Sequence, residues 1–200
     1  KSYLLRARTL LLQQKHEALF YAAFELRWCI EARQREYAEA QREYTKSKKI
    51  RSWNLTETQR QLEHVFRSKK IAIVSLYFDE LLDIHYDCFY TPVTAELVRL
   101  AENRLHEFLH AMKHFRPKED VWWNDARAIL IDIYRRSWVA CRGNMLAPPL
   151  LNKETSSLKT TLSLDREGDE IIIPFLQQGR RFTIQVKYMK EPPVDWKPDL

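Results

Sequence analysis

The stretch Ala18-Leu-Phe-Tyr-Ala-Ala-Phe-Glu-Leu-Arg-Trp-Cys-Ile-Glu31 decides the fold, because its apolar residues recur every three or four positions. This is the period of a helix with one buried face. The positions that share the spacing are Leu19, Ala22, Ala23, Leu26, Cys29 and Ile30. Arg33 then interrupts the apolar stripe, and Tyr37 resumes it one turn later. The sequence therefore predicts a long helix over residues 15–48.

Further helices are predicted on both sides of this one, over residues 3–14, 54–67, 92–115 and 119–141. Asn54 followed three residues later by Glu57 is typical of a capping box at a helix start. Thr91-Pro92 favours another helix start, and Arg116-Pro117 favours a stop. The pattern is therefore that of a helical bundle.

Strands are predicted in two places. Residues 70–78 and 84–90 are rich in β-branched and aromatic side chains, which favours a β-hairpin turning at 79–83. After Met145-Leu-Ala-Pro-Pro149, three further strands are expected at 158–164, 171–175 and 181–188, separated by turn residues around Gly168 and Gly179. We therefore expect a mainly α fold. A helical domain over residues 1–145 would hold the inserted hairpin, and a small antiparallel β meander would lie in a C-terminal appendage over 150–200.

Composition narrows the function classes. Hydrophobic residues make up 45% of the 200 positions, which is enough for a core. The sequence contains no run of eighteen apolar residues, which argues against a membrane span. Three widely spaced cysteines without a Cys-x-x-Cys pair favour a reduced, cytoplasmic protein. Three scattered glycines exclude a phosphate-binding loop. We expect no cofactor and no resident metal.

The net charge of +6 is unevenly distributed along the chain. Residues 1–70 carry sixteen Lys and Arg against eight Glu, whereas residues 71–200 carry seventeen against nineteen acidic residues. A basic half beside a nearly neutral half favours a polyanionic partner such as RNA or other nucleic acid. The alternative is a solvated helix that is simply rich in Lys and Arg.

The candidate functional stretch is Arg99-Leu-Ala-Glu-Asn-Arg-Leu-His-Glu-Phe-Leu-His-Ala-Met-Lys-His114. At about 100° per residue, five polar side chains of this stretch lie within roughly 80° of one another around the helix axis and form one face. Arg104 lies near the edge of the apolar face. The residues of that face are Arg99, Asn103, His106, His110 and His114. This pattern allows a metal-free nuclease, a zinc hydrolase, or a polar face without chemistry.

The nuclease interpretation pairs an arginine with a histidine a few residues later. Metal-free RNA cleavage needs a base for the 2′-hydroxyl, an acid for the leaving oxygen and a cation for the phosphate. Arg104 with His110 and Arg99 with His106 both have suitable spacing, particularly where two copies meet across a dimer. The zinc interpretation instead uses His106-Glu107-Phe-Leu-His110, with a third ligand from Glu119, Asp120 or Asp125.

The Arg-x5-His spacing and the helix Ala22-x-x-Glu25-Leu26-Arg27-x-x-Ile30-Glu31 resemble the HEPN family, as does the segment Phe108-Leu-His-Ala111. These small helical bundles are common in prokaryotic toxins and antiviral defence proteins, and their nuclease members carry Arg-x4–6-His. The resemblance covers about residues 3–140 and leaves the C-terminal β segment unexplained. The family's usual small polar residue after the arginine is replaced here by Leu105 or Leu100.

The resemblance implies a cytoplasmic protein acting on RNA in antiviral defence or toxin-type RNA metabolism, as a dimer or with a protein partner. His110 would be the acid or base and Arg104 would stabilise the phosphate, with Arg99, Asn103 and His106 lining the cleft. Arg99 with His106 is the reserve assignment. Arg27 and Glu31 would pair with each other or orient the motif arginine across the bundle. The alternatives are a non-catalytic binding subunit of a larger complex and, least favoured, a zinc hydrolase.

Overall fold

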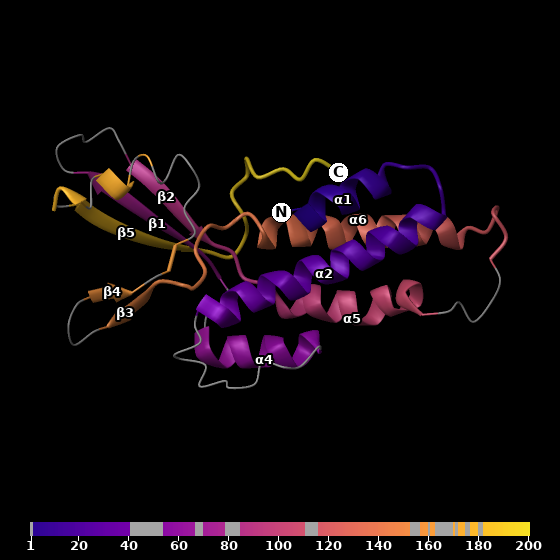
Figure 1. The fold of residues 1–200 in the computed structure, drawn as a ribbon, viewed down its shortest axis with the longest axis horizontal. Helices are drawn as coiled ribbons and strands as arrows, with labels where there is room; N and C mark the ends of the chain where they lie inside the picture. The colour runs from indigo at the N-terminus through magenta and orange to yellow at the C-terminus, as the bar shows by residue number, and fades with distance from the viewer. Residues whose placement is uncertain are drawn as a thin grey trace.

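The computed structural model describes residues 2–40, 54–66, 70–78, 85–110, 116–152, 157–159, 161–162, 170, 172–174, 177–179 and 182–200. Its helices are α1 (Ser2–Leu11), α2 (Glu17–Ala40), α4 (Leu55–Phe66), α5 (Ala95–Leu109) and α6 (Trp122–Ala140). They form a bundle at one end of an elongated molecule, and the strands lie at the other end (Figure 1). The expectation of a mainly α fold with an inserted β-hairpin is confirmed.

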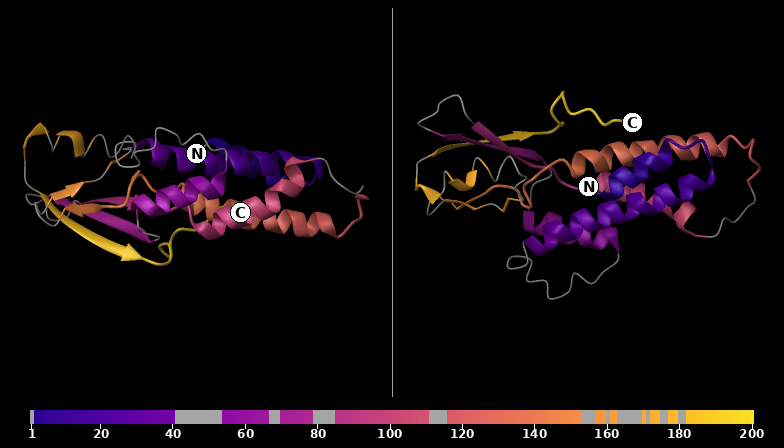
Figure 2. Two further views of the ribbon diagram at one scale, coloured as in Figure 1. Left: turned by 90° about the horizontal axis from the view of Figure 1, so that it is seen from below. Right: turned by 45° about the horizontal axis from the view of Figure 1, so that its top comes forward.

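The long predicted helix, α2, is the centre of the bundle, since it packs against α1, α4, α5 and α6. Its small residues Ala22 and Ala23 are fully buried, which allows the neighbouring helices to approach closely. The predicted continuation of this helix over residues 41–48 lies outside the described residues. Two views of the ribbon show α1 and α6 along one side of α2, with α4 on the opposite side (Figures 1 and 2).

The structure confirms one predicted helix start and contradicts another. The start of α4 agrees with the sequence, because the Asn54 side chain accepts a hydrogen bond from the Glu57 N–H at 3.1 Å. The predicted start at Thr91-Pro92 is wrong, because α5 begins at Ala95 behind the N-cap Thr94, whose hydroxyl accepts from Leu97 N–H. Thr91 is instead buried in the link between a strand and α5.

The predicted hairpin is confirmed by β1 (Ile71–Phe78) and β2 (His85–Tyr90), which pair antiparallel with Val74 opposite Cys88. The last strand, β5 (Phe182–Met189), pairs antiparallel with the other side of β1, giving the order β2-β1-β5. The predicted boundary at residues 145–150 therefore separates strands that belong to one sheet. Figure 2 shows β5 alongside the hairpin in both views.

The strands predicted between residues 150 and 175 differ from the observed ones. A short hairpin forms from β3 (Leu150–Asn152) and β4 (Ser157–Lys159), and Leu162 makes an isolated bridge to Met145. The strand predicted at 171–175 is wrong, because residues 172–174 are helical. Local β-propensity is a weak signal that tertiary context overrides here.

The C-terminal tail returns along the bundle to the first helix. Asp199 forms an ion pair with Arg8 at 2.7 Å and accepts a hydrogen bond from the Tyr134 hydroxyl at 2.6 Å. Figure 1 shows this tail beside α1 and α6. Among the described helices, none has both the length and the apolar character required to cross a membrane.

Candidate functional site

The polar face of α5 carries three of the five predicted site residues. Arg99, Asn103 and His106 are all exposed and succeed one another at one-turn spacing. The opposite face anchors the helix in the core through Leu97, Val98, Ala101, Leu105 and Phe108. The amphipathic pattern therefore places this part of the predicted site correctly on one surface.

His110 does not belong to that helical face. The helix predicted to reach residue 115 ends at Leu109, and His110 is the C-cap with φ −116° and ψ 162°, which is extended backbone. The His110 N–H still donates to the carbonyl oxygen of His106 at 3.3 Å, which is the last bond of the helix. The predicted alignment of His110 with His106 is therefore wrong, and His114 lies outside the described residues.

The two candidate arginines differ in their surroundings. Arg104 forms an ion pair with Glu107 at 3.6 Å on the same helix. Arg99 is exposed and makes no ion pair within the part of the chain that the structure describes. An incoming phosphate would therefore compete with a carboxylate at Arg104 but not at Arg99. This difference favours the reserve assignment, Arg99 with His106.

The imidazole of His106 is oriented by its own helix. Its Nδ1 lies 3.2 Å from the carbonyl oxygen of Glu102. Since a carbonyl oxygen only accepts, Nδ1 must carry the proton, and the other ring nitrogen, Nε2, is left with a lone pair in the neutral ring. His106 is therefore arranged so that Nε2 can accept a proton from a bound molecule.

A charged cluster beneath this face ties α5 to α2. Arg27 forms ion pairs with Glu31 at 2.7 Å and with Glu102 of α5 at 3.3 Å. The expected pairing of Arg27 with Glu31 is confirmed. The cluster reaches α5 through Glu102, one residue before Asn103, so it holds the backbone of the candidate site against the central helix.

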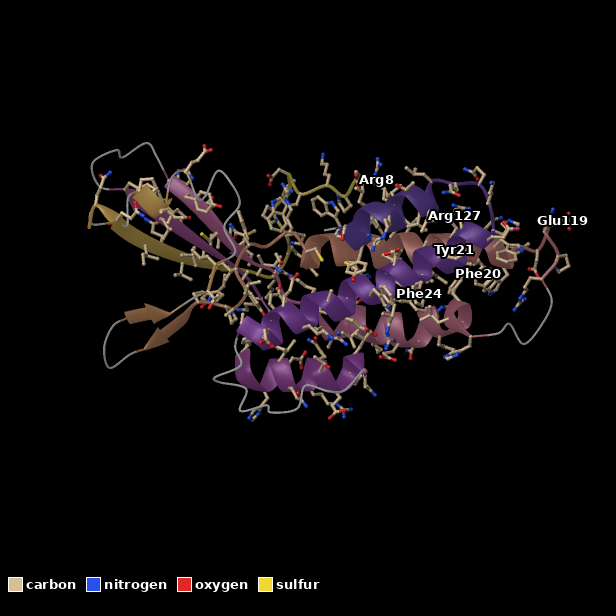
Figure 3. The ribbon with its side chains drawn as sticks, viewed as in Figure 1. Arg8, Phe20, Tyr21, Phe24, Glu119 and Arg127 are labelled. Carbon is tan, nitrogen blue, oxygen red and sulfur yellow. The ribbon has the colours of Figure 1, made fainter. Side chains whose placement is uncertain are left out.

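The zinc alternative depends on two histidines one turn apart on a continuous helix, and α5 ends before the second of them. Asp120, one of the suggested third ligands, instead accepts from the Trp122 N–H at 2.9 Å and lies 3.5 Å from Arg116. Glu119 lies on the turn before α6 (Figure 3). Over the described ranges, no group of three or more His, Cys, Asp or Glu side chains is placed to hold a metal ion.

Much of the positive charge on α1 and α2 is already neutralised. Four of their arginines form ion pairs with N–O distances of 2.7 to 2.8 Å, namely Arg6–Glu25, Arg8–Asp199, Arg27–Glu31 and Arg33–Glu36. Five further Lys and Arg fall within residues 41–53, outside the described residues. The described part of the basic half therefore offers few unpaired cations to a nucleic acid.

A cavity of about 230 Å³ lies at the other end of α5 from His106. Its lining includes the aromatic rings of Tyr37, Phe66 and Tyr90 together with Thr94 at the start of α5. None of the five predicted site residues lines it. The cavity and the Arg99–His106 face are therefore separate features of the molecule.

The junction between bundle and sheet contains buried polar groups that the sequence motifs did not predict. Arg33 is buried, and its Nε donates to the carbonyl oxygen of Ala140 at 3.0 Å while its Nη2 donates to that of Gly143 at 2.7 Å. The hydroxyl of Tyr37 donates to the carbonyl oxygen of Thr91. The sequence feature that indicated this buried polar junction was the interruption of the apolar stripe at Arg33.

Comparisons with known proteins give no identification: no family model matches this sequence, and it has no match among curated proteins or solved structures. The resemblance to the HEPN family therefore stays a prediction.

Proposed function

We propose that this protein is a HEPN-like RNA-acting protein of the cytoplasm, serving antiviral defence or toxin-type RNA metabolism, and that the exposed face of α5 contacts the RNA. The observation that supports this most directly concerns Arg99. It is exposed, makes no ion pair among the described residues, and shares its helix face with Asn103 and His106. An unpaired guanidinium is suited to a phosphate because it donates two parallel hydrogen bonds.

The chemistry that this face supports is metal-independent cleavage of the RNA backbone. His106 Nε2 would accept the proton of the 2′-hydroxyl, and Arg99 would stabilise the negative charge that develops on the phosphate. Asn103, between them on the same face, would orient the phosphate through its side-chain amide. The leaving 5′-oxygen still requires a proton from a second group.

A second copy of the chain would supply that group. The residues of the α5 face are open to solvent, and general acid–base catalysis is efficient where the reacting groups are held in place and shielded from water. A twofold axis beside α5 would bring the His106 side chains of two copies to one RNA phosphate. The proposal is therefore a homodimeric nuclease in which each protomer contributes Arg99 and His106.

Cleavage of a labelled single-stranded RNA in excess EDTA tests this proposal. Wild type should cleave, and His106→Ala and Arg99→Ala should each lose at least about 100-fold of the rate, the usual contribution of a proton-transfer group. Matched controls are His110→Ala and Arg104→Ala, which remove the same side-chain types nearby and should retain most of the activity. Loss of activity in the controls alone would reverse the assignment to Arg104 and His110.

A non-catalytic binding subunit is the second candidate, and the aromatic surface of α2 favours it. Tyr21, Phe24 and Trp28 are exposed although they lie on the central helix of the bundle, and Figure 3 labels the first two along α2. Exposed aromatic side chains are typical of protein interfaces. Absence of RNA cleavage and RNA binding in wild type, with a partner lost in the Tyr21→Ser/Phe24→Ser variant, would favour this candidate.

A further inference from the structure

Two thiols that are remote in sequence meet where the bundle joins the sheet. The Sγ atom of Cys29 on α2 lies 3.5 Å from the Sγ atom of Cys141, the C-cap of α6. Cys29 is buried, whereas Cys141 is partly exposed. Cys141 is therefore the more exposed residue of the pair, and a small oxidant would have to approach from its side.

A positive charge lies beside this pair. Arg33 follows Cys29 by one helical turn, and its guanidinium donates to the carbonyl oxygens of Ala140 and Gly143, on either side of Cys141. The hydrogen bond from Cys29 and the charge of Arg33 lower the pKa of Cys141, although burial opposes this. The same hydrogen bond and burial raise the pKa of Cys29. Cys141 is therefore the better nucleophile of the two.

We propose that Cys29 and Cys141 are a peroxide-reactive pair that closes to an intramolecular disulfide. The Cys141 thiolate attacks a hydroperoxide, so that an S–O bond forms, the O–O bond breaks, and water or an alcohol leaves after protonation. The Cys29 sulfur then attacks the sulfenic acid, forming the S–S bond and releasing water. Overall, two thiols lose two electrons and two protons, and the hydroperoxide is reduced by the same two electrons.

The position of Cys141 suits this closure. A disulfide has an S–S distance of about 2.05 Å, so the two sulfur atoms must approach by about 1.5 Å. Cys141 has φ −94° and ψ 0° at the end of α6, where the backbone leaves the helix. A small rotation there moves its sulfur without shifting α2. The cross-link would close a loop of about 110 residues and raise the melting temperature by roughly 10 °C.

Hydrogen peroxide treatment of the reduced, full chain tests the pair. After the reaction is quenched, free thiols are alkylated under denaturing conditions and the peptides are mapped by mass spectrometry without reduction. Wild type should lose two of its three thiols and yield a peptide pair that joins Cys29 to Cys141, and dithiothreitol should restore both. The oxidised chain should melt at the higher temperature.

Three variants assign the roles. Cys88→Ser removes the third thiol, which is buried on β2, and should behave as wild type. Cys29→Ala should stop at a sulfenic acid on Cys141 that dimedone traps, and Cys141→Ala should lose this reaction. The mapping on wild type alone decides the matter if a variant does not fold. Three intact thiols after treatment, a disulfide that includes Cys88, or cross-links solely between chains would overturn the proposal.

Discussion

Arg33 on the central helix donates from Nη2 to the carbonyl oxygen of Gly143 at 2.7 Å, across the junction between the bundle and the sheet. The same guanidinium satisfies the last carbonyl oxygen of α6, that of Ala140, and lies 4.5 Å from the centre of the Tyr37 ring. A buried cation is tolerated here because backbone oxygens, a carboxylate and an aromatic face surround it. The junction is therefore stabilised by Arg33 together with the Thr91 hydroxyl, which donates to the Ala140 carbonyl oxygen and accepts from the Gly143 N–H.

Replacing Arg33 by Met should lower the free energy of unfolding by about 1–3 kcal/mol. The variant keeps the aliphatic stem but leaves the buried carbonyl oxygen of Gly143 without its donor, whereas that of Ala140 still accepts from the Thr91 hydroxyl at 2.9 Å. Chemical denaturation followed by circular dichroism measures the difference. Arg60→Met on the exposed surface of α4 is the matched control and should change the value by less than about 0.5 kcal/mol. Equal values for the two variants would contradict this account of the junction.

Gly143 is expected to tolerate no side chain. A Cβ atom there would lie 2.5 Å from the carbonyl oxygen of Phe89 and 2.6 Å from the hydroxyl of Thr91. Gly143→Ala should therefore destabilise by about 1–3 kcal/mol or more, as overpacking does. Gly179→Ala meets no atom within 4 Å but has φ +63°, so it should cost about 1 kcal/mol from backbone strain alone. Thermal unfolding of both variants checks the order.

Stability should fall at high pH because buried tyrosines resist ionisation. Burial raises the pKa of Tyr37 to about 12, and burial also raises that of Tyr90. Since the folded-state pKa of Tyr37 lies above the unfolded value of 10, its contribution is complete below pH 10 and is lost as the pH rises toward 12. That loss amounts to about 3 kcal/mol for Tyr37.

Urea unfolding at pH 9 and pH 11 measures this effect. Tyr37→Phe should flatten the decline, and Tyr21→Phe, at an exposed tyrosine of the same helix, should leave it unchanged. A decline of equal slope in wild type and Tyr37→Phe would assign the effect to other groups.

Salt dependence of RNA binding should distinguish the two arginines of α5. If Arg99 contacts a phosphate, Arg99→Ala should reduce the slope of log K against log salt by about 0.7, the value for one phosphate contact on a single strand. Arg104→Ala should leave the slope nearly unchanged, because Glu107 already neutralises that side chain. Fluorescence anisotropy at several salt concentrations gives both slopes. A larger change for Arg104→Ala would refute the preference for Arg99.

The helices were predictable from the sequence because their apolar residues repeat at helical spacing, and the capping hydrogen bond at Asn54 is a local feature. The end of α5 was not predictable. Residues 110–116 contain neither Gly nor Pro, so local propensity gives no reason for the chain to leave the helix at His110. The error placed His110 on a face that it does not share.

The strand at residues 182–189 was predictable from its composition, but its partner was not, because β1 lies more than 100 residues earlier in the sequence. The proximity of Cys29 to Cys141 has the same origin, since only the packing of α2 against α6 brings them together. At the candidate site, residue type and spacing identified the α5 face. The choice between Arg99 and Arg104 required the position of the Glu107 carboxylate.

The pairing of β5 with β1 has a consequence for biosynthesis. Val74 pairs with Val186, so β1 leaves the ribosome 112 residues before the strand that completes its sheet is translated. At 5–20 residues per second this interval lasts roughly 6–20 s. During that time the helical bundle can fold while one edge of β1 still lacks its strand, and such open edges promote association with other chains. The nascent protein therefore depends on late synthesis of its C-terminal residues, and chaperones that cover strand edges would act in this interval.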